Sequence, residues 1–459
     1  MPLSGLQPDR TPSSAPIGSP PRHERPTSSR YGVLSFSVGL AVILYLDRMA
    51  INVAMPAIAE DLDLRIAQVG DSVAAFFWCY ALFQVPAGWL GDRWGGRRAL
   101  TVYVVAWSLA MAGLGLVGGL ISLVLMRALL GIGQAGAFAT TASFLRRWMP
   151  FNRRGFANSA VSLGGRAGGV LAPALTPMLM MLAATFIPGM DRWRPVFLAY
   201  ALIGLVVAVL FWLWFRDEPR LHPSCNAAEA TLIAGDEPAQ ANSVLPGGPI
   251  PFVALLRSPG LQFLALINFC VNVGWIFLAT WLPTYLIKVH GKSEAEAGLY
   301  TSFTAAAGMA GCLAGGLATD FLVKRLGLRW GRRVPGMISY GGAAIGLCVC
   351  WALDDVTAIV TVLVITSFFG DFALGAMWST YQDIGGPYAG TVLGWANMCG
   401  NIGAACAISI IGRIVEDYGW SPTFVMASSA YLVGALCWLF VDPHATIDVS
   451  RSGFSSARR

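Results

Sequence analysis

The chain has 459 residues, of which 56% are hydrophobic and 12% are charged, and its mean hydropathy is +0.61. A soluble domain carries about 25% charged residues, so this sequence lacks the polar surface that a soluble two-domain enzyme needs. The net charge of +6 does not indicate nucleic acid as a partner, because the basic residues follow the loops between apolar runs rather than one face or one tail.

The chain begins with residues 1–30, which are rich in Pro, Ser and Arg and contain no apolar run. We expect a disordered cytoplasmic N-terminus here and no signal peptide, because a signal peptide needs a hydrophobic segment. Twelve apolar runs follow, each long enough to cross a bilayer, since about 20 residues at a rise of about 1.5 Å cover about 30 Å. The predicted spans are about 33–56, 72–90, 99–117, 120–145, 156–182, 195–215, 261–287, 297–323, 334–353, 357–381, 389–413 and 421–441.

These runs predict an all-α integral membrane protein with 12 transmembrane helices in two pseudo-symmetric six-helix bundles, 31–215 and 261–442. The polar stretch 216–260 shows no helical periodicity and is predicted to be a central cytoplasmic loop, and 443–459 is predicted to be a cytoplasmic tail. Most of the 31 Lys and Arg residues fall on the side of this layout that holds both termini. Arginine and lysine mark the cytoplasmic side, so we expect a multi-pass protein of the inner (plasma) membrane with both ends inside.

The two predicted bundles repeat each other in sequence. The glycine pattern of Gly155–Gly168 returns in Gly390–Gly403, and Trp193–Phe197 returns as Trp420–Phe424. Each copy lies half the chain length after the first, which indicates duplication of a six-helix unit. A transporter built from such repeats binds its substrate near the midplane, between the repeats.

The turn between the second and third spans reads Gly88-Trp-Leu-Gly-Asp-Arg-Trp-Gly-Gly-Arg-Arg98, and a weaker copy, Gly316-Leu-Ala-Thr-Asp320, follows in the second half. The first turn resembles the motif Gly-x-Leu-x-Asp-Arg-x-Gly-x-Arg-Arg of the major facilitator superfamily at every position. Within that superfamily the chain is similar to the anion:cation symporter family, which includes bacterial sugar-acid and hexuronate permeases and the vesicular glutamate and sialic acid carriers. The resemblance covers about residues 31–442. It rests on the stretches Tyr45–Asn52, Phe76–Pro86, Arg127–Gly133, Trp281–Tyr285 and Gly394–Asn401.

The resemblance implies a permease that moves a carboxylated small molecule, often together with protons, by alternating access. It implies that Arg48 and Arg127 bind the substrate carboxylate, that Tyr80 and Asn397 line the polar cavity, and that Asp47 is a proton site. In the superfamily the charged turn clamps one conformation. The candidate gating residues are therefore Asp92, Arg93, Arg97, Arg98 and, in the weaker copy, Asp320.

One position departs from the pattern of the family. The family has a glutamate after Arg-x-Leu-Leu-Gly-x-Gly, where protonation is linked to substrate binding, but this chain has Gln134, and glutamine does not titrate. We therefore weigh proton symport, with Asp47 or Asp371 as the proton carrier, against an uncoupled facilitator or an anion exchanger. A drug efflux carrier fits less well, because such carriers favour apolar cavities. A non-transporting membrane sensor that kept the fold would bind a ligand without moving it.

The chemistry of arginine supports an anion site independently of the resemblance. An arginine near the bilayer centre costs about 2.5–3.5 kcal/mol, so it normally faces a cavity or an opposite charge. Its planar guanidinium suits a carboxylate in bidentate fashion. Arg127 and Gln134 lie two helical turns apart on one face, a spacing of about 10 Å that suits the two ends of a small polyhydroxy acid. The candidate substrate-binding residues are Arg48, Tyr80, Arg127, Gln134, Arg166, Tyr285 and Asn397, and the proton-coupling candidates are Asp47 and Asp371.

Structural roles remain open for the same charged residues. Arg127 could form an ion pair with Asp47, and Arg48, which is adjacent to Asp47, could serve helix packing. Arg166 could be a third positive charge for a dianionic substrate, or could lie near the cytoplasmic end of its helix, snorkelling or paired. Asp371 could carry a proton, or could be the charge partner of an arginine inside the membrane.

Other classes of function lack their signatures in this sequence. No phosphate-binding loop of the Gly-x4-Gly-Lys-Ser/Thr type occurs, so direct ATP coupling is not expected, and no nucleophile with a partner base stands at a recognisable spacing. The nine cysteines lie mostly within apolar runs and have no metal-ligand spacing. We expect no enzyme activity, no cofactor and no metal. The expected partners of a monomeric chain are a small organic anion, protons and the lipid bilayer, with no nucleic acid.

Overall fold

The computed structural model describes residues 25–64, 66–235 and 252–446. The first bundle consists of α1 (Ser29–Asp61), α2 (Ile66–Trp94), α3 (Gly96–Leu114), α4 (Leu120–Ala135), α5 (Ala137–Trp148), α6 (Arg154–Phe186) and α7 (Arg194–Trp214). The connection between the bundles carries α8 (Ala227–Ala234) and α10 (Phe252–Arg257). The second bundle consists of α11 (Pro259–Ile276), α12 (Leu282–His290), α13 (Glu294–Trp351), α14 (Val356–Phe372), α15 (Leu374–Gly385), α16 (Ala389–Tyr418) and α17 (Ser421–Cys437).

These helices make the twelve predicted spans, although helices and spans do not correspond one to one. The pairs α4–α5 and α14–α15 are single spans interrupted at Gly136 and Ala373, and a π-helix, Phe277–Trp281, joins α11 to α12 within one span. The helix α13 is two spans joined at Gly327, whose positive φ of 75° is a conformation that glycine adopts without strain. Eight continuous helical stretches in the described part of the chain are long and apolar enough to cross a membrane, and the longest two contain two spans each.

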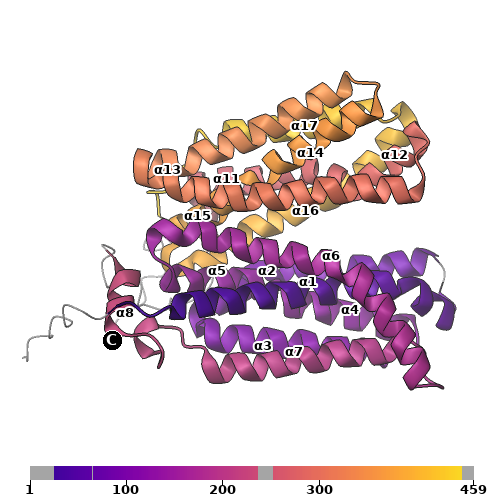
Figure 1. Cartoon of the computed structure of the whole chain (residues 1–459), viewed down its shortest axis with the longest axis horizontal. Helices are drawn as coiled ribbons and strands as arrows, with labels where there is room; N and C mark the ends of the chain where they lie inside the picture. Colours follow the sequence, from indigo (N-terminus) through magenta and orange to yellow (C-terminus); the bar gives the residue numbers. More distant parts are fainter. Residues whose placement is uncertain (1–24, 65, 236–251, 447–459) are drawn as a thin grey trace, which may run out of the picture.

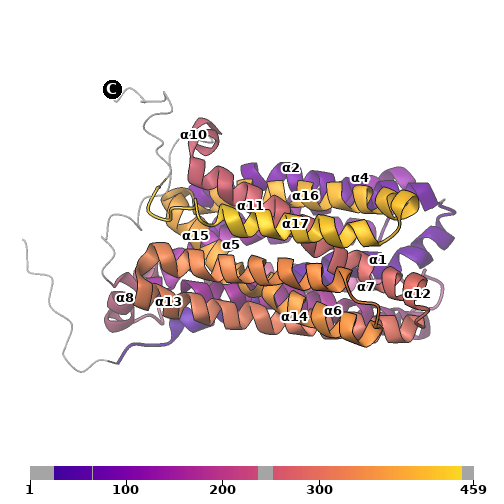
Figure 2. The same cartoon turned by 90° about the horizontal axis from the view of Figure 1, so that it is seen from above.

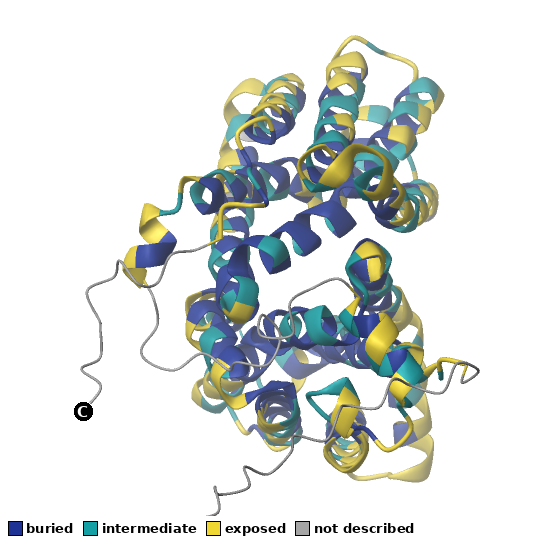
Figure 3. Ribbon diagram, turned by 90° about the vertical axis from the view of Figure 1, so that its left-hand side faces the viewer, coloured by how far each residue is buried: buried dark blue, intermediate teal, exposed yellow. Residues whose placement is uncertain are grey.

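The two bundles lie side by side with their helices roughly parallel (Figures 1 and 2). In the first bundle α1 packs on α6, α2 on α4 and α3 on α7, and in the second bundle α11 packs on α16 and α13 on α14 and α17. Between the bundles, α2 packs on α16 and α6 on α13. Seen along the helices, the buried residues gather inside each bundle and where the bundles meet, while exposed residues cover the outside (Figure 3). We call the end of the molecule that holds α8 and the start of α1 the α8 end.

The segment 216–260, in which the sequence showed no helical periodicity, contains in its described part the 3-10 helix Pro219–Leu221 and the short α-helices α8 and α10. An eight-residue helix is too short to give a periodic signal, and α8 is instead stabilised by its contacts. The Asn226 side chain caps α8 by accepting from the Glu229 backbone N–H, at 2.9 Å. The fully buried Glu229 carboxylate accepts from the backbone N–H groups of Ser29 and Arg30, at 3.0 and 3.1 Å, and pairs with the Arg30 guanidinium at 2.9 Å. Glu229 thus satisfies free N–H groups at the start of α1 and fixes α8 to the first bundle.

This contact predicts a pH-dependent attachment of α8. Burial raises the pKa of Glu229, but the hydrogen bonds from Thr27, Arg30 and Ser29 and the charge of Arg30 outweigh burial, so the pKa lies below its ordinary value. The attachment is therefore complete at neutral pH and is lost as the pH falls through the lowered pKa. We expect Glu229→Gln to speed trypsin cleavage after Arg30 several-fold at pH 7. Glu218→Gln, whose carboxylate forms no ion pair among the described residues, is the control, and unchanged cleavage of Glu229→Gln would refute the prediction.

Candidate functional site

Two buried arginines meet halfway along the first bundle. Arg48 of α1 and Arg127 of α4 are 8% and 1% exposed, and both face α2. The Arg48 guanidinium lies 4.3 Å from the centroid of the Tyr80 ring and 5.2 Å from that of Phe76, and Arg127 lies 5.2 Å from Phe76. Both cations therefore share one aromatic ring, and such cation–π contacts contribute about 2 kcal/mol or more when desolvated.

Gln134 belongs to the same group of side chains. Its side-chain oxygen accepts from Arg48 Nε at 3.2 Å, and its amide nitrogen donates to the Leu44 carbonyl at 3.3 Å. Arg127 Nε donates to the Ser72 carbonyl at 3.2 Å. These contacts hold both guanidiniums in place without neutralising their charge.

Each of the two arginines has a guanidinium nitrogen that is left without a partner. Arg48 Nη2 and Arg127 Nη1 are buried and have no hydrogen-bond partner among the residues that the structure describes. Neither arginine has a carboxylate within 4.0 Å in that part of the chain. Buried N–H donors nearly always have a hydrogen-bond partner, and buried charges nearly always have a counter-ion. Two unpartnered donors on two unpaired guanidiniums therefore indicate a position for an anion from outside the protein.

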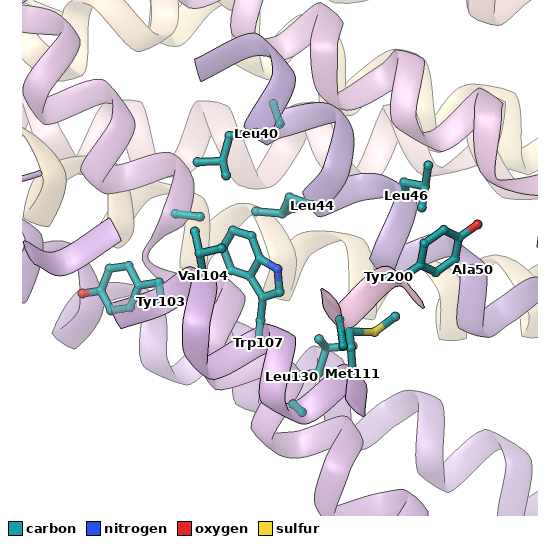
Figure 4. Packing of buried hydrophobic residues seen from close by; sticks show 14 of the residues in the cluster. Leu40, Leu44, Leu46, Ala50, Tyr103, Val104, Trp107, Met111, Leu130 and Tyr200 are labelled. Atoms are coloured by element: carbon teal, nitrogen blue, oxygen red, sulfur yellow. The ribbon is translucent and has the colours of Figure 1, made fainter. Parts of the chain in front are cut away.

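Asp47 is not the counter-ion of these arginines. It is 1% exposed, and neither carboxylate oxygen has a hydrogen-bond partner within the described ranges. Successive residues of a helix point about 100° apart, so Asp47 turns away from α2 toward α3, where its polar neighbour is Trp107. Figure 4 shows that Trp107 stands in an apolar cluster with Leu44 and Val104. The Asp47–Arg127 ion pair considered from the sequence is therefore absent from the described structure.

Arg166 and Asp371 meet across the two bundles. Arg166 Nη2 of α6 lies 2.5 Å from Asp371 Oδ1 of α14. Arg166 is 12 residues beyond Arg154 at the start of α6, which places it about 18 Å into the bundle, near the midplane. Asp371 is thus the charge partner of an arginine inside the membrane, which was one of the two interpretations of Asp371 from the sequence. Arg166 is paired rather than snorkelling.

Two other predicted site residues lie apart from the arginines. The Tyr285 hydroxyl is 3.0 Å from His290 Nε2, and its ring packs against Trp420 and Phe424 near the end opposite α8. Asn397 of α16 is half-buried, and its carbonyl accepts from Asn401. Neither Tyr285 nor Asn397 contacts Arg48 or Arg127 within the described part of the chain.

Two aromatic residues that contact the arginines were not among the predicted site residues. Phe76 contacts both guanidiniums. The centroid of the Tyr45 ring lies 4.9 Å from the Arg48 guanidinium. The sequence spacing of Tyr45 and Phe76 could have identified both. Tyr45 stands one helical turn before Arg48, and Phe76 stands one turn before Tyr80, so each pair shares a helix face.

The charged turns close the α8 end by capping helices of the opposite bundle. Asp92 of α2 accepts from the backbone N–H groups of Gly390 and Thr391 at the start of α16, at 2.9 and 2.7 Å. It also accepts from the hydroxyls of Thr391 and Ser143, both at 2.7 Å. Close approach of α2 to α16 requires glycine, because a Cβ on Gly88 would lie 2.3 Å from the Gly390 carbonyl oxygen.

The second turn makes the same contact in the opposite direction. Asp320 of α13 accepts from the backbone N–H groups of Gly155 and Phe156 at the start of α6, both at 2.9 Å. Asp383 adds charge to this interface, since it lies 2.9 Å from Arg332 of its own bundle and 3.9 Å from Arg154 of the other.

The arginines of the first turn make contacts other than with Asp92. Arg93 lies over the Trp89 ring, Arg97 donates to the Trp212 carbonyl at 2.8 Å within its own bundle, and Arg98 is exposed. None of the three forms an ion pair with Asp92 among the described residues. The turn is held by Asp92 at the start of α16 and by Asp217, which accepts from the backbone N–H groups of Gly96 and Arg97 and pairs with Arg147.

The chain matches the family model described as Major Facilitator Superfamily, over residues 38–407 and 315–456. It is 30% identical to the probable sulfoacetate transporter SauU of Cupriavidus necator, covering 92% of this chain and 95% of that protein. It is 28% identical to the hexuronate transporter of Bacillus subtilis (90% and 94% covered) and 29% identical to the D-galactonate transporter of Escherichia coli (91% and 96% covered).

Solved structures agree on the fold. The proton:xylose symporter XylE aligns with a TM-score of 0.68 at 15% identity, covering 90% of this chain and 96% of that one. The Escherichia coli fucose:proton symporter FucP aligns with a TM-score of 0.67 at 13% identity, covering 90% of this chain and all of that one. These matches and the twelve-span fold agree: the chain is a multi-pass membrane transporter rather than an enzyme, and it belongs to the major facilitator superfamily, among the relatives that form the anion:cation symporter family.

Proposed function

We propose that this protein is a secondary active transporter that moves small organic anions, such as sugar acids, by alternating access. The observation that carries the proposal is the pair of buried, unsatisfied guanidinium groups of Arg48 and Arg127, near the midplane of a two-bundle transporter fold. The names of the relatives support the substrate class, since sulfoacetate, hexuronates and galactonate are all carboxylic acids.

Charge compensation explains why an anion belongs in this position. A buried arginine without a counter-ion is costly in a low-dielectric setting, and a bound carboxylate removes much of that cost while accepting hydrogen bonds from the guanidinium fork. Gln134 and Tyr80 stand beside Arg48 and offer polar contacts to hydroxyl groups of a sugar acid. Arg48, Arg127, Gln134 and Tyr80 thus form the acid-binding part of the proposed site.

The same proposal assigns an orientation. The α8 end carries basic residues of the charged turn, including Arg93, Arg97 and Arg98, and we assign it to the cytoplasm because basic loops mark that side. The hydrogen bonds of Asp92 and Asp320 close this end. In this assignment the protein is closed toward the cytoplasm, and both termini are cytoplasmic.

Proton coupling is the finer part of the proposal, and Asp47 is the carrier we assign. It is a buried carboxylate with no hydrogen-bond partner among the described residues, beside the acid-binding part of the site. A buried carboxylate without a counter-ion is a position where a proton can supply the missing charge compensation. Asp371 is paired with Arg166 and fits the role less well. The alternative is an uncoupled facilitator or anion exchanger, which the non-titrating Gln134 favours.

The first test is uptake of labelled galactonate, glucuronate and sulfoacetate into proteoliposomes. We expect saturable uptake by the wild-type protein. Arg127→Gln should weaken half-saturation by about 10-fold to 100-fold, because hydrogen bonds to charged groups contribute about 1.5–3 kcal/mol. Arg192→Gln, which removes an exposed arginine, is the matched control. Equal half-saturation in Arg127→Gln and the control would refute the site, and saturable binding without flux would indicate a sensor.

The second test imposes an inward proton gradient on the same proteoliposomes. We expect the wild-type protein to accumulate the acid above its external concentration. Asp47→Asn should abolish accumulation while leaving uptake that equilibrates, because asparagine has the size of aspartate but cannot carry a proton. Accumulation by Asp47→Asn would exclude Asp47 as the carrier, and wild-type uptake that ignores the gradient would support the uncoupled alternative.

The third test concerns the closed α8 end. Asp92→Asn removes one of the two oxygens that cap α16, so we expect the two bundles to separate more readily at this end. Ser379, which is fully buried between the bundles, reports the separation when it is changed by Ser379→Cys in a chain without other cysteines. Labelling by a thiol reagent should become several-fold faster in Asp92→Asn. Unchanged labelling together with a weakened half-saturation would assign Asp92 to substrate binding instead.

A further inference from the structure

The ion pair between Arg166 and Asp371 joins the two bundles deeper than the other polar contacts between them. The contacts of Asp92, Asp320 and Asp383 lie at the α8 end, near the starts of α6 and α16. The Arg166–Asp371 pair lies about 18 Å beyond the start of α6. It therefore lies within the membrane span, on the α8 side of Arg48, where Gly164 and Gly168 of α6 pack on Val38 and Val42 of α1. The inference below rests on the proposed site.

The two partners of this pair differ in accessibility. The Arg166 side chain is 23% exposed, while the Asp371 side chain is 5% exposed. Asp371 is covered by neighbours of the second bundle, since a Cβ on Gly308 would lie 2.3 Å from Asp371 Oδ2 and 2.9 Å from the Ser367 hydroxyl. A molecule that enters between the bundles thus reaches the guanidinium before it reaches the carboxylate.

The pair also leaves hydrogen-bonding capacity unused on both sides. Asp371 Oδ2 is buried and has no hydrogen-bond partner among the described residues. Among the described residues, Arg166 donates one hydrogen bond, from Nη2 to Asp371 Oδ1, although a guanidinium has five N–H donors and a bidentate pair would use two of them. Asp371 is therefore a single-contact partner, and an incoming carboxylate can make a second contact that Asp371 does not make.

Arg166 stands next to the acid-binding part of the proposed site. The ring of Tyr45 lies 4.9 Å from the Arg48 guanidinium, and Tyr45 is also a neighbour of Arg166. A Cβ on Gly165, the residue before Arg166, would lie 2.9 Å from the same ring. Tyr45 thus connects the two arginines, and a small molecule held at Arg48 can direct its other end toward Arg166.

We propose that Arg166 is a second acid-binding position of this site, which Asp371 occupies while the carrier is empty. The preferred substrates are then small organic dianions with an acid group at each end, such as aldarates or sulfocarboxylates. One acid group binds Arg48 and Arg127, and the other replaces Asp371 as the counter-ion of Arg166. Because Asp371 belongs to the other bundle, loading such a substrate also releases a contact that holds the bundles together.

A residue beside Asp371 can stabilise its carboxylate when it separates from Arg166. Tyr340 and Tyr431 of the same bundle are neighbours of Asp371. The Tyr340 hydroxyl donates to Met377 Sδ at 3.6 Å, but the buried Tyr431 hydroxyl has no hydrogen-bond partner within the described ranges. Tyr431 is thus a free donor beside the carboxylate that substrate displaces, and it can take over part of the role of Arg166.

The test compares matched acids that differ at one end. Galactonate and galactarate share a carbon skeleton, and only galactarate has a second carboxylate; acetate and sulfoacetate form a second matched pair. Affinities are measured on the purified full-length protein from the rise in Tm with ligand concentration. In the wild-type protein we expect each dianion to bind at least about tenfold tighter than its monoanion, as one additional charged hydrogen-bonded contact supplies.

The variants then separate the two acid positions. Arg166→Gln should weaken dianion binding about tenfold or more and monoanion binding less than about threefold. Asp371→Asn should strengthen dianion binding several-fold, because the competitor for Arg166 is removed. Asp354→Asn, at an exposed aspartate, and Arg192→Gln are the matched controls. If Arg166→Gln fails to fold, the Asp371→Asn variant alone tests the proposal. Dianion binding by Asp371→Asn that is weaker than in the wild-type protein, or unchanged, overturns the proposal.

The outcomes distinguish this inference from the function on which it rests. If neither acid of either pair binds the wild-type protein, the proposed anion site and this inference both fail. If monoanions and dianions bind equally, with a dependence on Arg127 but none on Arg166, the anion site stands and the second position is refuted. Equal losses for both acids in Arg166→Gln would assign Arg166 to holding the bundles together and would likewise refute it.

Discussion

The absence of water inside a bilayer is the constraint on which the rest of this structure depends. Each polar or charged group at membrane depth must find its partner within the protein, since lipid offers none. Most of these groups do so here: Asp92 and Asp320 are satisfied by backbone N–H groups, and Arg166 by Asp371. Arg48, Arg127 and Asp47 are charged residues that retain unpartnered polar atoms and form no ion pair in the described structure. In the proposed function, these three side chains are where an anion or a proton compensates the charge.

The duplicated architecture explains how the bundles are held at one end and remain separable. Asp92 caps a helix of the second bundle, and Asp320 caps a helix of the first, so each half contributes one carboxylate and one helix start. A carboxylate at a helix N-terminus gains from the free N–H groups and the helix dipole without a buried counter-ion. Such a contact is directional and local and depends on close approach of the two halves, which suits the opening and closing that the proposed alternating access requires.

The sequence predicted the fold almost completely and the site only in part, for a physical reason. Hydropathy located the spans because the bilayer demands apolar runs of fixed length, and arginines inside them were recognisable as costly. Contacts between residues far apart in the chain could not be predicted from the sequence. No local pattern indicates that Asp92 accepts from Gly390, 298 residues away, or that Arg166 pairs with Asp371. The helix α8 was missed because its stability comes from Glu229 and the start of α1 rather than from its own periodicity.

Gln134 connects the charge balance to the division into two bundles. A glutamate at this position, as in the family pattern, would give Arg48 a counter-charge within its own bundle, because the Gln134 oxygen already accepts from Arg48 Nε. With glutamine the first bundle keeps the positive charge of Arg48 and Arg127 uncompensated by a carboxylate within 4.0 Å among the described residues. Arg166 instead pairs with a carboxylate, Asp371, from the opposite bundle. In the proposed second acid position, compensation of the Arg166 charge is tied to the contact between the bundles, so an anion that replaces Asp371 there also changes what holds the two halves together.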